Sequence, residues 1–255
     1  MLLRLLLITL LSVKYYLCHT PNLYAEPAIK YSENSIAVVG QIPVPQGFKR
    51  LPVPTHSFAW WLRNIKLKED KTVYLYNGLP KRNQAAQFAV LNIPIGNKDL
   101  QQCADAVMRL RASYLFEERR FDEIIFKDNL GKSYAYNVKG NSHDFENYLE
   151  KVFAYCGTLS LEKQLKKVND IHDITAGDVF IKGGSPGHAI IVMDVAVNSA
   201  GEKVYMVAQS YMPAQDIHIL VNPLYAPVSP WYQVNDVNQI VTPEWIFERS
   251  QLKQW

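Results

Sequence analysis

The strongest constraint on the fold is a series of apolar segments in the C-terminal half, between residues 178 and 223. The segments are "DVFI", "HAIIVMDVAV", "VYMVAQSY" and "HILVNP". The connecting stretches "GGSPG" and "NSAGEK" are rich in glycine, proline and serine, which form turns. Short apolar segments joined by turns are typical of antiparallel strands. This half of the chain therefore predicts an antiparallel sheet.

Helical patterns lie mainly before this sheet. The strongest is an apolar stripe at helical spacing within residues 99–118, formed by Leu100, Cys103, Val107, Leu110 and Tyr114. Asp99 and Gln102 have the spacing of a capping box, so we expect this helix to begin at Asp99.

Further elements follow from the same signals. We expect a helix at 55–65 capped by Thr55 or Ser57, strands at 35–39, 72–77 and 86–93, a hairpin at 124–138 and helices at 143–157 and 160–168. Thr242 and Pro243 predict the start of a last helix. Helices that cluster early and strands that cluster late indicate an α+β fold, with the Cys103 helix packed on a mainly antiparallel sheet. A single domain over residues 26–255 is expected.

Composition and charge exclude several classes of function. The chain has 255 residues, of which 48% are hydrophobic and 20% charged, as in ordinary globular proteins. The net charge is +3, and it falls to +1 without Arg4 and Lys14. This balance argues against nucleic acid as a partner. The three cysteines and six histidines form no motif that binds a metal or cofactor, so we expect neither.

Residues 1–25 have the pattern of a secretory signal peptide: Arg4, a short apolar stretch and a cleavage site after Ala25. Lys14 interrupts the apolar stretch, which is short for a membrane span. We therefore expect export to the periplasm or cell envelope, with no membrane span after processing. A lipid on Cys18 and an uncleaved anchor are the alternatives.

Cys103 and His188 occupy positions that favour catalysis. Cys103 lies near the start of its predicted helix, where the helix dipole favours a thiolate. His188 stands where a glycine-rich turn becomes a strand, which would hold the imidazole rigidly. Cysteine nucleophiles need such a base and a third group that orients it. Taken singly, Cys103 is better explained by burial than by catalysis, and His188 by a turn or packing role.

Together these features resemble the histidine-containing half of papain-like cell-wall amidases and peptidases, the NlpC-type and CHAP families. The stretch "GDVFIKGGSPGHAIIVMDVAVNSAGEKVYMVAQS" carries the resemblance. In it, Gly177 and Asp178 precede a short strand, Gly187 and His188 begin the next one, and a further strand returns with a polar residue.

This resemblance implies a papain-like core over about residues 97–222. Within it, Cys103 would be the nucleophile, His188 the base and Gln209 the residue that orients His188. We expect the Cys103 sulfur to lie within about 4–5 Å of a His188 ring nitrogen, where the two groups could form an ion pair. A peptide or cell-wall fragment is the expected substrate, and no cofactor is expected to take part.

Most of residues 50–250 also resemble a bacterial family of exported proteins known only as a domain of unknown function. The stretches "LYNG", "NQ", "LQQCADAVMRLRA", "GDVFI", "GHAIIV" and "AQSYMPAQDIHIL" carry this second resemblance. It brings no established activity.

The third residue of the candidate site is less clearly marked than the other two. A turn through Ser199–Glu202 would place Gln209 opposite Val192, about 13 Å along the strand from His188. A longer turn would bring Gln209 closer, and a one-residue bulge would reverse its face. Asp194 shares the face of His188 but lies six residues away, and we expect it in solvent near the turn.

Other polar residues near Cys103 have simpler explanations than catalysis. Gln102 is expected to cap the helix rather than to donate to an oxyanion. Asp105, Arg109 and Arg111 are expected on the solvent face rather than as a substrate anchor. Cys156, at a helix end, is expected to be structural, and His218 is expected to lie on the surface or to be structural.

Three functions remain open at this point. The first is an exported cysteine amidase or peptidase, the second a non-catalytic envelope protein of the same fold that binds peptide or glycan, and the third a structural protein with a buried, inert Cys103.

Overall fold

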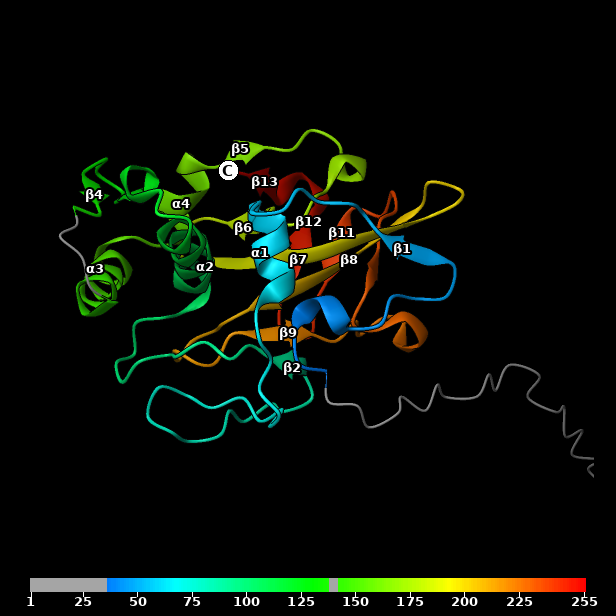
Figure 1. The fold of residues 1–255 in the computed structure, drawn as a ribbon, viewed down its shortest axis with the longest axis horizontal. Helices are drawn as coiled ribbons and strands as arrows, with labels where there is room; N and C mark the ends of the chain where they lie inside the picture. The colour runs from blue at the N-terminus through cyan, green and yellow to red at the C-terminus, as the bar shows by residue number, and fades with distance from the viewer. Residues whose placement is uncertain (1–35, 138–141) are drawn as a thin grey trace, which may run out of the picture. The chain divides into compact units, whose positions relative to one another are not determined.

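The computed structural model describes residues 36–137 and 142–255. The main element of this part of the chain is a nine-stranded sheet (Figure 1). These residues belong to one compact unit, Ser35–Trp255. The expected signal peptide, with Cys18 and Ala25, lies outside the described residues, as does Ser35 at the start of the strand expected at 35–39.

The order in the sheet is β2-β9-β8-β7-β6-β13-β5, with β1 paired to β7 and β10 to β8. The strands of the sheet are β1 (Phe48–Arg50), β2 (Gln87–Val90), β5 (Lys166–Lys167), β6 (Val179–Lys182), β7 (His188–Asn198), β8 (Lys203–Gln209), β9 (His218–Leu220), β10 (Tyr232–Gln233) and β13 (Leu252–Gln254). Two separate hairpins are β3 (Ile125–Lys127) with β4 (Ser133–Ala135) and β11 (Gln239–Val241) with β12 (Ile246–Glu248). The strand pairs described are antiparallel, as the sequence predicts.

The α-helices of the described residues are α1 (Phe58–Asn64), α2 (Cys103–Glu117), α3 (Ser142–Tyr155) and α4 (Thr158–Gln164). Short 3-10 helices lie at Val39–Gln41, Phe121–Glu123, Ile171–Asp173, Ala226–Val228 and Arg249–Gln251. Ser57 caps α1 by accepting a hydrogen bond from the Trp60 N–H at 3.2 Å, as expected. Mixed helices and a mainly antiparallel sheet confirm the α+β class.

The two faces of β7 pack against different layers because successive side chains of a strand point to opposite sides. Ala189 and Ile191 belong to a hydrophobic cluster that includes Val107 of α2. Ile190 and Val192 belong to a second cluster that includes Phe247 of β12. In Figure 1, α1 accordingly lies in front of β7, α2 lies beside the left end of β7, and the β11–β12 hairpin lies behind it.

A β-bulge in β7 sets the register of the β7–β8 hairpin. Val197 pairs with Lys203 and Asp194 with Met206, but Val192 pairs with Val207, so Met193 is an extra residue. The turn is also one residue longer than the turn expected at Ser199–Glu202. Each feature shifts the register by one residue, and together they move Gln209 two residues toward His188 without changing its face.

Three expected elements are wrong. The strand expected at 35–39 is not formed, because its described part holds only an isolated bridge at Val38 and the start of the 3-10 helix Val39–Gln41. Thr242 and Pro243 do not begin a helix, because they lie in the turn of the β11–β12 hairpin. There the Thr242 hydroxyl donates to the Trp245 carbonyl at 2.8 Å and accepts from the Trp245 N–H at 3.1 Å, so it closes a turn instead of capping a helix. The strand expected at 72–77 is reduced to isolated bridges at Tyr74 and Leu75.

Candidate functional site

Cys103 is the first residue of α2, so the helix begins later than the sequence predicts. The N-cap is Gln102, whose N–H donates to the Asp105 carboxylate at 3.0 Å. Asp99 instead accepts hydrogen bonds from the Gln102 side chain at 3.1 Å and from the Ala214 N–H at 2.6 Å. These bonds tie the segment before α2 to the loop after β8, and they place Cys103 where the helix dipole acts most strongly.

A cavity of about 290 Å³ lies beside Cys103. One wall is the loop Gly184–Gly187, which leads directly into His188, and another is formed by Asp105 and Met212. Cys156, expected to be only structural, lines the same cavity, and both cysteines are free and buried.

The Cys103 thiol lies in an environment that opposes its ionisation. Burial, and after it the nearby Asp105 carboxylate, raises the pKa of the Cys103 thiol to about 11. Backbone N–H groups of Ala104, Ala189 and Cys103 itself oppose this rise. Because Ala189 directly follows His188, the thiol lies beside the start of β7.

His188 is buried among aromatic rings on the β12 side of the sheet. Its ring centroid lies 4.7 Å from that of Tyr211, 5.3 Å from Trp245 and 5.7 Å from Phe247. Burial lowers the pKa of His188 to about 4, against a smaller opposite effect of its hydrogen bond to Gln209. The imidazole is therefore neutral at pH 7.

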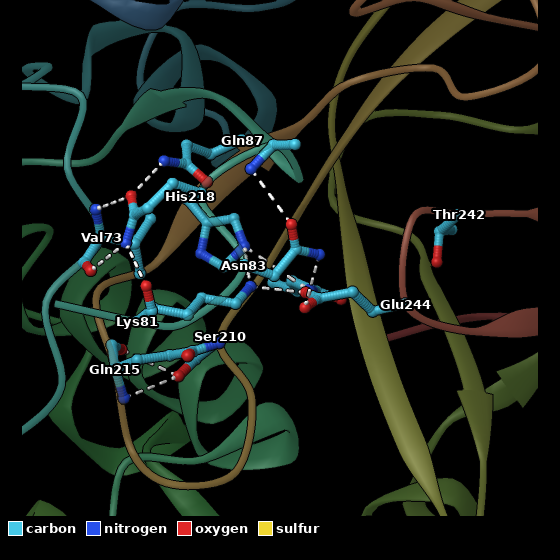
Figure 2. A network of polar contacts seen from close by, with 12 residues as sticks. Val73, Lys81, Asn83, Gln87, Ser210, Gln215, His218, Thr242 and Glu244 are labelled. Atoms are coloured by element: carbon cyan, nitrogen blue, oxygen red, sulfur yellow. Dashed lines mark hydrogen bonds and ion pairs between the residues drawn. The ribbon is translucent and has the colours of Figure 1, made fainter.

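Gln209, the predicted orienting residue, contacts His188 directly: its Oε1 lies 2.8 Å from His188 Nε2. The other end of the Gln209 amide lies 2.7 Å from Glu244 Oε2 and 3.5 Å from His218 Nε2. Lys81 Nζ lies 2.5 Å from the same Glu244 oxygen and 3.5 Å from His218 Nε2. We call these five residues the His188 cluster, and Figure 2 shows its Lys81, His218 and Glu244 side chains converging from separate segments.

The hydrogen bonds of Gln209 determine which nitrogen of His188 carries the proton. A carboxylate only accepts hydrogen bonds, so the group of Gln209 that faces Glu244 is its NH₂. The Gln209 oxygen then faces His188 and accepts a hydrogen bond from Nε2–H. In the neutral ring the lone pair consequently lies on Nδ1.

The expected ion pair between Cys103 and His188 is not favoured by these environments. With a thiol pKa of about 11 and an imidazole pKa of about 4, both groups are neutral at pH 7. Throughout residues 36–137 and 142–255, no hydrogen bond or ion pair joins the two side chains. Burial of both groups disfavours two separated charges.

Several residues near Cys103 on α2 do not lie on the solvent-exposed face that the sequence predicts for them. Asp105 and Arg109 are buried, and they do not pair with each other. Arg109 instead forms two hydrogen bonds of 2.9 Å with Glu146. The Arg111 guanidinium lies over aromatic rings, 5.1 Å from that of Phe58. The side chains of α3 and α1 cover this part of α2, which helical periodicity alone does not reveal.

Asp194 is also buried, not exposed near the turn as expected. It accepts hydrogen bonds from Arg50 Nε at 2.6 Å and from Arg63 Nε at 2.7 Å. Both arginines come from the N-terminal part of the chain, so a local view of the β7–β8 hairpin misses them. Asp194 therefore has a structural role and is not the third residue of the candidate site.

Three members of the His188 cluster are not predicted from the sequence as site residues. His218 was expected to be structural, but it lies opposite Gln209 in the β8–β9 ladder, and burial lowers its pKa to about 3. The alternation of side-chain direction along β9 is a sequence signal that could have indicated the position of His218. Glu244 falls within the helix expected at Thr242, and Lys81 lies in a loop with no periodic pattern.

Gly187 has no room for a side chain, and the loop before His188 depends on it. A Cβ atom there would lie 2.4 Å from the Gly184 carbonyl oxygen and 2.6 Å from Thr158 Oγ1. We expect Gly187→Ala to lower the free energy of unfolding by about 1–3 kcal/mol, the usual cost of overpacking. Chemical denaturation measures this, with Gly157→Ala as control because its Cβ would meet nothing within 4 Å. Equal losses in both variants would contradict the steric explanation.

No helix within the described part of the chain is long and apolar enough to cross a membrane. Neither a curated protein nor a solved structure matches the chain. A family model does match, over residues 38–142 and 136–254, which together cover most of the sequence. The chain therefore belongs to the family described as a domain of unknown function (4846).

Proposed function

We propose that this protein is an exported cysteine amidase or peptidase of papain-like type, acting on bacterial cell-wall peptide. The observation that carries the proposal is the position of Cys103 at the start of α2, where it lines the cavity beside the start of β7. On that strand, His188 donates its Nε2–H to Gln209, which leaves Nδ1 as a proton acceptor. The Cys103 thiol interacts with the N–H of the next residue, Ala189.

The reaction proceeds from neutral groups. The Cys103 sulfur attacks the carbonyl carbon of an amide while its proton passes to His188 Nδ1, and the protonated imidazole then gives this proton to the departing amine. Water then attacks the thioester while the same imidazole takes its proton. The acid is released, and the imidazolium returns this proton to the departing Cys103 sulfur. General-base catalysis of this kind suits a histidine whose charged form is disfavoured at rest.

The cavity supports a substrate of modest size. Its volume of about 290 Å³ lies at the lower end of the range for small-ligand sites. It accommodates a short peptide segment beside Cys103 rather than a folded protein.

The proposal is tested by incubating the full chain with a mixture of cell-wall muropeptides and following amide cleavage by mass spectrometry. Wild type is expected to release new amine and acid ends. Cys103→Ala and His188→Ala are expected to lose this turnover, and Gln209→Ala to retain a reduced rate. Cys156→Ser is the matched control, since it changes the other cavity cysteine and should retain activity. Equal turnover in wild type and Cys103→Ala would refute the assignment.

A second candidate is a non-catalytic protein that binds peptide or glycan in the same cavity. The burial of His188, which is 1% exposed, favours it, because a base must reach its substrate. Saturable binding of muropeptides by wild type, without cleavage, would establish this candidate in place of the first.

A further inference from the structure

The Gln209 side chain is held at both ends, and its two ends have different partners. Its oxygen lies 2.8 Å from His188 Nε2, and its nitrogen lies 2.7 Å from Glu244 Oε2. Gln209 is 1% exposed, so water does not supply alternative partners. An amide that turned by 180° would bring its oxygen against the carboxylate and its NH₂ against His188.

Two further contacts fix the partners of this amide. Lys81 Nζ lies 2.5 Å from the same Glu244 oxygen, so the carboxylate has a buried cation beside it. His218 Nδ1 lies 2.9 Å from the Asp216 carbonyl oxygen, which only accepts, so Nδ1 carries the proton of the neutral ring. His218 Nε2 is then an acceptor for the Gln209 NH₂ and for Lys81 at 3.5 Å. Both groups that face the Gln209 nitrogen, Glu244 Oε2 and His218 Nε2, are therefore acceptors, and they require the amide orientation that points its oxygen at His188.

The orientation of the amide has a chemical consequence for His188. When the Gln209 oxygen faces the ring, Nε2 carries the proton and Nδ1 has the lone pair. A turned amide would present its NH₂ to Nε2, which would become the acceptor, and the proton would move to Nδ1. The ring would then have no lone pair on Nδ1 with which to take a thiol proton.

We propose that Glu244, paired with Lys81, is a positioning residue that fixes the Gln209 amide and through it the Nε2–H tautomer of His188. This role rests on the proposed function, in which Nδ1 is the base. Glu244 does not touch the reacting atoms; it acts on His188 through Gln209, beside a smaller direct electrostatic effect that raises the pKa of His188. It reaches the cluster from the turn of the β11–β12 hairpin, which is far in sequence from the two strands that carry His188 and Gln209.

The test compares variants that differ in the acceptor offered to Gln209. Glu244→Gln keeps one oxygen that can accept from both Lys81 and Gln209. The double change Lys81→Met with Glu244→Leu removes this oxygen without leaving a buried charge unpaired. Asn83→Ala is the matched control, because Asn83 contacts the other Glu244 oxygen at 3.3 Å and not Gln209.

The measurement is the tautomer of His188 by ¹⁵N nuclear magnetic resonance of the labelled full chain at pH 7. Wild type, Glu244→Gln and Asn83→Ala are expected to show a protonated Nε2 and an unprotonated Nδ1. The double variant is expected to populate the Nδ1–H form, and its muropeptide turnover should fall at least about tenfold, in line with the loss of a general base. Thermal unfolding of each variant shows that the fold is retained.

A double variant that keeps the wild-type tautomer would overturn the positioning role, and so would a wild type with its proton on Nδ1. Because the resonance measurement needs no substrate, it decides the positioning role even where no muropeptide is cleaved. Absence of turnover with the expected tautomers would count against the proposed function alone.

Discussion

Asp194→Ala is expected to lower the free energy of unfolding by about 3–5 kcal/mol, the cost of removing one partner from a buried ion pair. The Asp194 carboxylate is fully buried and lies 2.6 Å from atoms of both Arg50 and Arg63. Without it, two largely buried guanidinium groups lose their counter-charge. The Val195 N–H, now 2.8 Å from the same carboxylate, also loses its acceptor.

The matched control is Asp236→Ala, at an ion pair on the surface. Asp236 lies 3.0 Å from Arg249, but its side chain is 88% exposed. Exposed pairs contribute about 0–1 kcal/mol, so little change is expected. Urea denaturation of both variants gives the comparison. A loss below about 1 kcal/mol for Asp194→Ala would show that the two arginines find other partners or water.

Iodoacetamide is expected to alkylate Cys103 at least about 30-fold more slowly than a free cysteine at pH 7. A thiol with a pKa of about 11 is ionised to only about one part in 10,000 at that pH, against about 3% for a pKa of about 8.5. The thiolate fraction is thus about 300-fold smaller. The higher pKa makes the thiolate about tenfold more nucleophilic, which offsets part of the difference.

The pH dependence of this alkylation follows from the direction of the shift. Burial disfavours the thiolate, so the rate should rise about tenfold per pH unit until the pH approaches 11. His188→Ala should leave the rate at pH 6 and 7 unchanged, because a neutral imidazole lends no charge to the thiol. The measurement uses Cys18→Ser with Cys156→Ser as background, so that one thiol is counted. If Cys103 were labelled faster than a free cysteine at pH 6, the result would contradict this prediction and support the ion pair predicted from the sequence.

Much of the fold could be predicted because its signals are local. The apolar runs "HAIIVMDVAV" and "VYMVAQSY", bounded by turn residues, indicate β7 and β8, and the stripe through Cys103 and Leu110 indicates α2. These patterns depend on the periods of strands and helices, which the backbone fixes by itself. The sequence does not predict the turn at 242–245, because Thr followed by Pro suits either a helix start or a turn, and only the pairing of β11 with β12 decides between them.

The positions of Cys103 and His188 at the ends of α2 and β7 also follow from the sequence alone. The contact between Gln209 and His188 does not follow from the sequence, because a longer turn and a bulge at Met193 together set the register, and neither has a local signal. Lys81 and Glu244 join the cluster from segments 163 residues apart in the chain. The pKa values of Cys103 and His188 likewise depend on burial, which folding brings about. The sequence by itself therefore determined most of the elements and placed Cys103 and His188 near the starts of theirs, since both depend on neighbours along the chain. Only the tertiary structure decided the charge states and partners of those residues, because desolvation and hydrogen bonding depend on groups that folding brings together.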